Sequence, residues 1–161
     1  MYHFNVTLHV LAAILWLGGM FFFALVGAPV LRKVEPAELR SELFRALGTR
    51  FRAFGWITIA VLLVTGLLNL QFRGMLSTRV LGSSEFWHTK FGLALGWKLS
   101  AVASMLILQA IHDFALGPAA SRAEANSDRA IGLRRWAALL ARVSALIGLL
   151  VIGAAVRLTR S

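Results

Sequence analysis

The 161-residue sequence contains no cysteine. This absence excludes disulfides, zinc sites built from thiolates, iron–sulfur clusters and thiolate-bound copper. A metal ion bound by this chain must therefore use histidine, methionine, carboxylate or another ligand without a thiol. Acidic residues are also scarce, because 7 Asp and Glu stand against 17 Lys and Arg, for a net charge of +10.

Sequence features typical of nucleic-acid and nucleotide binding are missing as well. No basic run alternates with base-stacking aromatic residues, and no Walker sequence, Gly-rich phosphate loop or sequence repeat is found. The cations instead flank apolar stretches, where they anchor helices and meet anionic headgroups. We therefore expect the lipid bilayer, and no nucleic acid, as the partner of this basic chain.

Four apolar stretches fill most of the sequence, which is 58% hydrophobic with a mean hydropathy of +0.74. Residues 4–31 and 53–72 contain no charged side chain, and residues 91–112 and 136–156 contain one cation each, Lys98 and Arg142. Each stretch reaches the length of about 20 residues that a helix needs to cross a bilayer. A cation inside such a stretch costs ~2.5–3.5 kcal/mol on insertion, so it either extends to the interface or serves a function.

These stretches predict an all-α fold, an integral membrane bundle of four transmembrane helices forming a single domain over residues 1–161. The expected helices cover about 4–31, 37–73, 87–116 and 130–158, and Gly117-Pro118 is expected to end the third. The chain start has no Lys or Arg before its apolar run, unlike a secretory signal, so we expect the first helix to be retained.

The distribution of cations predicts the orientation in the membrane. The connections over 32–52 and 113–135 carry ten Lys and Arg, whereas the opposite side carries five. Because cytoplasmic connections are the more basic ones, both termini are expected outside, in the inner membrane of a bacterium.

Helical spacing selects the residues that could carry chemistry. Seven-residue steps keep side chains near one face of a helix, and they relate His9 to Trp16 on the first helix. The same steps relate Lys98, Met105 and His112 on the third. Met20 lies one turn beyond Trp16. Thr58, Thr65 and Asn69 form a polar stripe on the second helix, which predicts hydrogen bonds between helices.

Several of these residues match a known group of membrane proteins. The first helix resembles that of CopD-like proteins and of the related HemJ-type protoporphyrinogen oxidases. The residues that carry the resemblance are His9, Trp16, Gly18, Gly19, Thr65-Gly66-Leu67, Trp97-Lys98-Leu99, His112-Asp113 and Gly117-Pro118. The resemblance covers about three of the four helices.

The resemblance implies a four-helix core, associated with haem b in the HemJ branch and with copper uptake in the CopD branch. In a haem-binding member, His9 would be an axial ligand beside Trp16. Lys98 would be the second ligand or a propionate partner, and Lys90 competes for that role. A haem-binding member would be a membrane oxidoreductase that exchanges electrons with a quinone or a porphyrin. A second copy of the chain, in a homodimer, is a further candidate partner.

Two other functions compete with haem binding. Copper uptake or copper resistance is the first, with His9, Met20, Met105 and His112 as metal ligands along the path. The second is a non-catalytic structural subunit of a membrane complex.

Overall fold

In the computed structural model, residues 1–123 and 127–158 are described, and they form helices and turns with no strand among them. Four helical segments are long and apolar enough to cross a membrane: Tyr2–Leu31, Ala37–Phe72, Lys90–Ala120 and Ile131–Gly153. The predicted all-α fold with four spanning helices is confirmed. The chain divides into two compact units, Met1–Ser84 and Glu85–Ser161, which we describe one at a time. The single domain over 1–161 stays a prediction.

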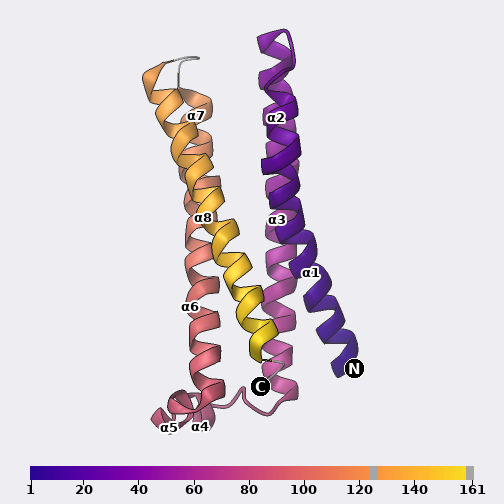
Figure 1. Cartoon of the computed structure of the whole chain (residues 1–161), viewed down its shortest axis with the longest axis vertical. Helices are drawn as coiled ribbons and strands as arrows, with labels where there is room; N and C mark the ends of the chain where they lie inside the picture. The colour runs from indigo at the N-terminus through magenta and orange to yellow at the C-terminus, as the bar shows by residue number, and fades with distance from the viewer. Residues whose placement is uncertain (124–126, 159–161) are drawn as a thin grey trace. The chain divides into compact units, whose positions relative to one another are not determined.

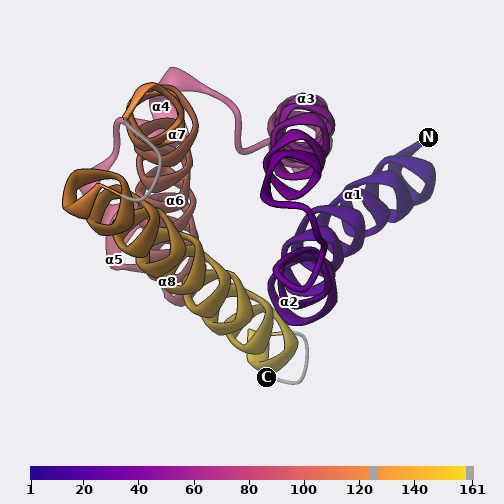
Figure 2. The same ribbon diagram turned by 90° about the horizontal axis from the view of Figure 1, so that it is seen from above.

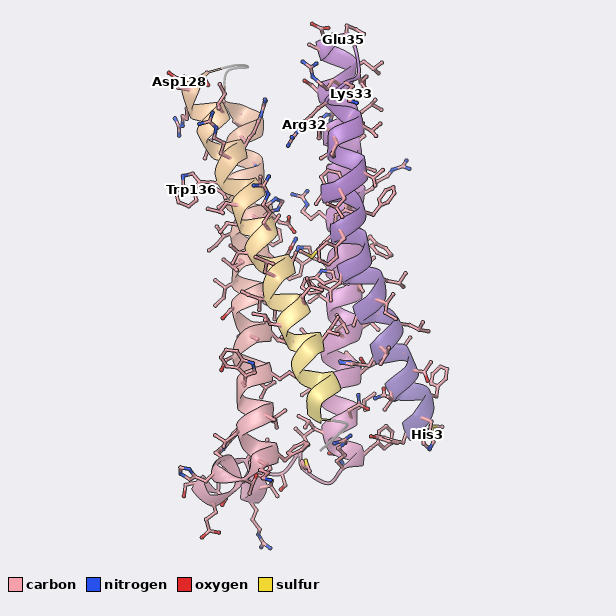
Figure 3. The ribbon with its side chains drawn as sticks, viewed as in Figure 1. His3, Arg32, Lys33, Glu35, Asp128 and Trp136 are labelled. Atoms are coloured by element: carbon pink, nitrogen blue, oxygen red, sulfur yellow. The ribbon has the colours of Figure 1, made fainter. Side chains whose placement is uncertain are left out.

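The first unit is a hairpin of two long helices. It begins with α1 (Tyr2–Phe22), continues through a π-helical turn η1 (Phe23–Gly27) into α2 (Ala28–Leu31), and returns as α3 (Ala37–Phe72). Figure 1 shows α1 and α2 running along α3, with the N-terminal end of α1 diverging from it. In Figure 3, Arg32, Lys33 and Glu35 lie at the turn of this hairpin and His3 at its opposite end. Charged side chains thus gather where the chain reverses.

Small residues allow the two helices of this hairpin to approach closely. A Cβ atom at Gly19 would lie 3.1 Å and 3.2 Å from two ring carbons of Phe51 on α3. The same Phe51 ring stacks on Phe23 with centroids 5.6 Å apart. At the other end, the Tyr2 hydroxyl accepts hydrogen bonds from the Arg73 guanidinium at 3.1 Å and 3.3 Å. Contacts along the two helices and a hydrogen-bonded pair at the end opposite the turn therefore hold the hairpin together.

A glycine in a left-handed conformation ends α3. Gly74 has a φ of 67°, a left-handed conformation that costs glycine little. This turn brings the Met75 N–H to the Leu70 carbonyl at 3.0 Å and the Gly74 N–H to the Gln71 carbonyl at 2.9 Å. Two carbonyls of the last turn are thus satisfied. A short helix α4 (Thr78–Leu81) follows.

The second unit is also a hairpin. After α5 (Ser84–His88) it comprises α6 (Lys90–Ala110), a π-helical turn η2 (Ile111–Leu116), α7 (Gly117–Arg122) and α8 (Asp128–Leu158). Figure 2 shows α8 crossing α6 at an angle, and α8 also packs on η2 and α7. Asp128 lies at the turn end of α8 and Trp136 two turns further along (Figure 3). The basic connection is again at the reversal of the chain.

The expected end of the third helix at Gly117-Pro118 is wrong, because the helix continues to Arg122. Pro118 is the second residue of α7 and follows the widened turn η2. A proline in the first turn of a helical segment lacks an N–H that this turn does not need, so the helix can continue through it.

Candidate functional site

His9 on α1 contacts Thr65 on α3, and this pair is the centre of a polar cluster in the first unit. The His9 Nδ1 lies 2.7 Å from the Thr65 Oγ1. Thr65 is buried, with 3% of its surface exposed, whereas His9 is half-buried. A Cβ at Gly66 would lie 3.5 Å from His9 Cε1, an ordinary van der Waals distance, so the ring lies against this part of α3. The imidazole therefore rests against α3 with its Nδ1 edge held inside the hairpin.

The hydroxyl of Thr65 determines which nitrogen of His9 carries the proton. Its oxygen lies 2.6 Å from the carbonyl oxygen of Val61, one turn earlier on α3. Two oxygens this close require a hydrogen between them, so the hydroxyl donates to Val61 and accepts from His9. In the neutral imidazole the proton of His9 is thus on Nδ1, and Nε2 carries the lone pair. This is the tautomer in which an imidazole binds a metal ion or a haem iron through Nε2.

Asn5 extends the cluster by one helical turn. Its Nδ2 donates to the Thr65 backbone carbonyl at 2.9 Å and to the Asn69 Oδ1 at 2.9 Å, which uses both amide hydrogens. Asn5 is buried, with 6% exposed. The predicted hydrogen bonds between helices are confirmed for Thr65 and Asn69, whereas Thr58 bonds to the Phe54 carbonyl of its own helix. Sequence reasoning did not single out Asn5, although its spacing of four residues from His9 matches that of Thr65 and Asn69.

The other predicted residues of the first helix lie further along it. Trp16 is buried, with 9% exposed, and Met20 is half-buried. Trp16 is seven residues from His9, which corresponds to about 10 Å along a helix. The structure therefore places Trp16 in the packing of the hairpin, two turns from the imidazole, and the predicted roles of Trp16 and Met20 stay predictions.

A second polar cluster lies in the π-helical turn of the second unit. The Asp113 Oδ1 lies 2.8 Å from the His112 Nδ1, and its Oδ2 accepts a hydrogen bond from the Gln109 Nε2 at 2.8 Å. The side chain of Asp113 is 6% exposed, against 35% for His112. Met105, two turns earlier on α6, is buried at 4%. The carboxylate is thus enclosed while the imidazole reaches the surface of the unit.

The two lysines singled out from the sequence are exposed on α6. Lys90 is the first residue of that helix, and Lys98 lies one heptad before the buried Met105. Lys98 and Met105 are seven residues apart on α6, yet one is exposed and the other is buried, so this face of the helix is not uniformly buried. His9 and the two lysines belong to different units, so their joint action stays a prediction.

No group of three or more His, Asp or Glu that could hold a metal ion occurs within residues 1–123 and 127–158. The candidate sites consist instead of single oriented imidazoles, His9 and His112, each with a hydrogen-bond partner at Nδ1. Such an imidazole can serve as one ligand of a haem iron or of a Cu(I) ion with few ligands.

Comparison with known proteins relates the chain to a described family. The family model of CopD, copper resistance protein D, matches residues 45–158, from within α3 to the end of α8. An uncharacterized protein of Aquifex aeolicus (strain VF5) is 30% identical over 153 residues, which covers 94% of this chain and 90% of the relative. No solved structure matches the chain significantly. The matched range includes Thr65, Lys98 and His112 and leaves out the helix that carries His9.

Proposed function

Because the chain belongs to the CopD family of multi-pass membrane proteins, we propose that it binds copper ions within the membrane, with His9 as the ligand in its first unit. The observation that carries this proposal is the bond from His9 Nδ1 to Thr65, which leaves the lone pair on Nε2. The family name supplies the identity of the ion, and the imidazole supplies a ligand that copper favours.

The residues at His9 suit a copper ion that binds reversibly and is then released. The chain has no cysteine, so the ion cannot be held by thiolates. A single imidazole binds a cation less tightly than a closed cage of several ligands does. A ligand of this kind can therefore release its ion, as copper uptake or copper resistance requires. We place the protein in a bacterial inner membrane with both termini outside, because ten cations lie on the connections of one side and five on the other.

Haem b is the second candidate, and it is favoured by one observation. An axial ligand to haem iron needs only one imidazole of fixed tautomer, and His9 provides it beside Gly66, which has no side chain to hinder a flat ring system. A bound haem would supply electron transfer to a quinone or a porphyrin. In that case the Thr65 hydroxyl would orient the ligand, and Lys98 or Lys90 would remain candidates for a propionate partner.

The experiment that tests this proposal uses the full chain purified in detergent, with copper and haem measured on the same sample. We expect Cu(I) to bind, and the His9→Ala variant to lose one equivalent of copper while keeping its helical circular dichroism. His88→Ala is the matched control, because this histidine is exposed on α5 and lies outside both clusters. A Soret band that disappears in His9→Ala would decide for haem b. A colourless protein that binds no copper would refute both and leave a structural subunit.

A further inference from the structure

The two units follow the same backbone plan. In each, a long helix passes through a π-helical turn, η1 or η2, into a short helix whose second residue is proline, Pro29 or Pro118. These prolines are 89 residues apart, since 118 − 29 = 89. The first helices begin at Tyr2 and Lys90, and the returning helices at Ala37 and Asp128, which are shifts of 88 and 91 residues.

Three pairs of buried positions also share the shift of 89 residues. Trp16 corresponds to Met105, and both are buried. On the returning helices, Gly55 corresponds to Ser144 and Ile59 to Gly148, and all four are buried. The two units therefore repeat one order of helices and turns, with small differences in the length of their connections.

This repeat provides an internal comparison for the polar cluster of η2. The positions of Gln109, His112 and Asp113 correspond to Met20, Phe23 and Ala24 in the first unit. The first unit forms its π-helical turn with these apolar residues, and the Phe23 ring stacks on Phe51 there. The polar side chains of the second unit are therefore not needed to build the turn.

A carboxylate in a membrane-spanning helix is costly, and Asp113 is the only acidic residue of the span Lys90–Ala120. Its oxygens accept from Gln109 on one side and meet the His112 Nδ1 on the other. A carboxylate at Nδ1 fixes the imidazole orientation, makes Nε2 a stronger ligand and adds negative charge. In many metal sites a carboxylate supports a histidine ligand in this way.

We propose that His112, supported by Asp113 and Gln109, is a second copper-binding site, located in the π-helical turn of the second unit. This inference rests on copper as the ion bound by the protein. The ligand atom is Nε2 of His112, whose side chain is partly exposed, while the buried carboxylate holds Nδ1. The carboxylate of Asp113 at Nδ1 makes Nε2 of His112 a stronger ligand than Nε2 of His9, whose Nδ1 meets a hydroxyl, so this site binds Cu(I) more tightly.

The test is a titration of the full chain in detergent with Cu(I) under reducing conditions, against a chromophoric chelator. We expect two equivalents for the wild type, one for His112→Ala and one for His9→Ala, with the tighter equivalent lost in His112→Ala. Asp113→Asn keeps the size of the side chain and removes its charge, and should weaken the tighter equivalent by about 10–100-fold. His88→Ala should bind as the wild type.

The outcomes separate this inference from the proposed function. One equivalent in the wild type, lost in His9→Ala and kept in His112→Ala, would overturn the second site and leave the first. Unchanged affinity in Asp113→Asn would also overturn it, because the carboxylate would then have no effect on the ion. No copper bound by the wild type would overturn the proposed function itself.

Discussion

Replacing Thr65 with valine tests the assignment of the His9 tautomer. Valine keeps the branched shape of threonine and removes the hydroxyl that accepts the His9 Nδ1 proton. Because Thr65 is only 3% exposed, water does not readily take its place. The imidazole then loses the interaction that keeps its proton on Nδ1 and its lone pair on Nε2.

The size of the effect follows from the cost of this lost hydrogen bond. A buried donor left without its acceptor costs about 1–3 kcal/mol. If the tautomer that binds the metal carries this cost, the metal affinity falls by about 5–150-fold, since 1.4 kcal/mol corresponds to a factor of ten. Removal of a group that orients a metal-binding histidine typically costs about 10–100-fold in affinity, which lies within this range.

The assay is a competition titration with Cu(I) that follows the equivalent lost in His9→Ala. Thr65→Ser is the matched control, because serine retains a hydroxyl that can donate to the Val61 carbonyl and accept from His9. We expect Thr65→Ser to bind within about threefold of the wild type. If Thr65→Val also bound copper at His9 with wild-type affinity, the hydroxyl would have no part in preparing the ligand, and the reasoning from tautomer to site would be refuted.

Two further predictions concern the packing and the orientation of the chain. A Cβ at Gly19 would lie 3.1 Å from Phe51, whereas Gly18 has nothing within 4 Å. Gly18→Ala should therefore gain up to about 1 kcal/mol from helix propensity. Gly19→Ala should gain less stability than Gly18→Ala or lose stability, because its new methyl group meets Phe51. Unfolding of both variants in mixed detergent measures the difference. Equal changes in stability for the two variants would contradict the close approach of α1 and α3 at Gly19. For orientation, we expect an alkaline phosphatase fusion to be active after Ser161 and inactive after Ser121. The reverse pattern would mean that the ten-cation side faces outward.

The sequence by itself determined the membrane location and the four spans. The spans can be read from local sequence, because long stretches without charge, such as residues 4–31 and 53–72, favour the lipid interior. In lipid such a stretch must form a helix, whatever its neighbours are, to satisfy its backbone hydrogen bonds. The candidates His9 and His112 could also be named from sequence, since ionisable residues are rare in such stretches and the resemblance to CopD-like proteins pointed to them.

The partners of these histidines were decided by the tertiary structure. Which face of α1 meets α3 depends on how two whole helices pack, so the bonds from His9 to Thr65 and from Asn5 to Asn69 appear only in the folded hairpin. The continuation of the helix through Pro118 depends on the widened turn before it, which no residue preference specifies. The repeat of the hairpin was equally hidden, because different residues can fill equivalent buried positions, such as Trp16 and Met105, as long as their packing is preserved.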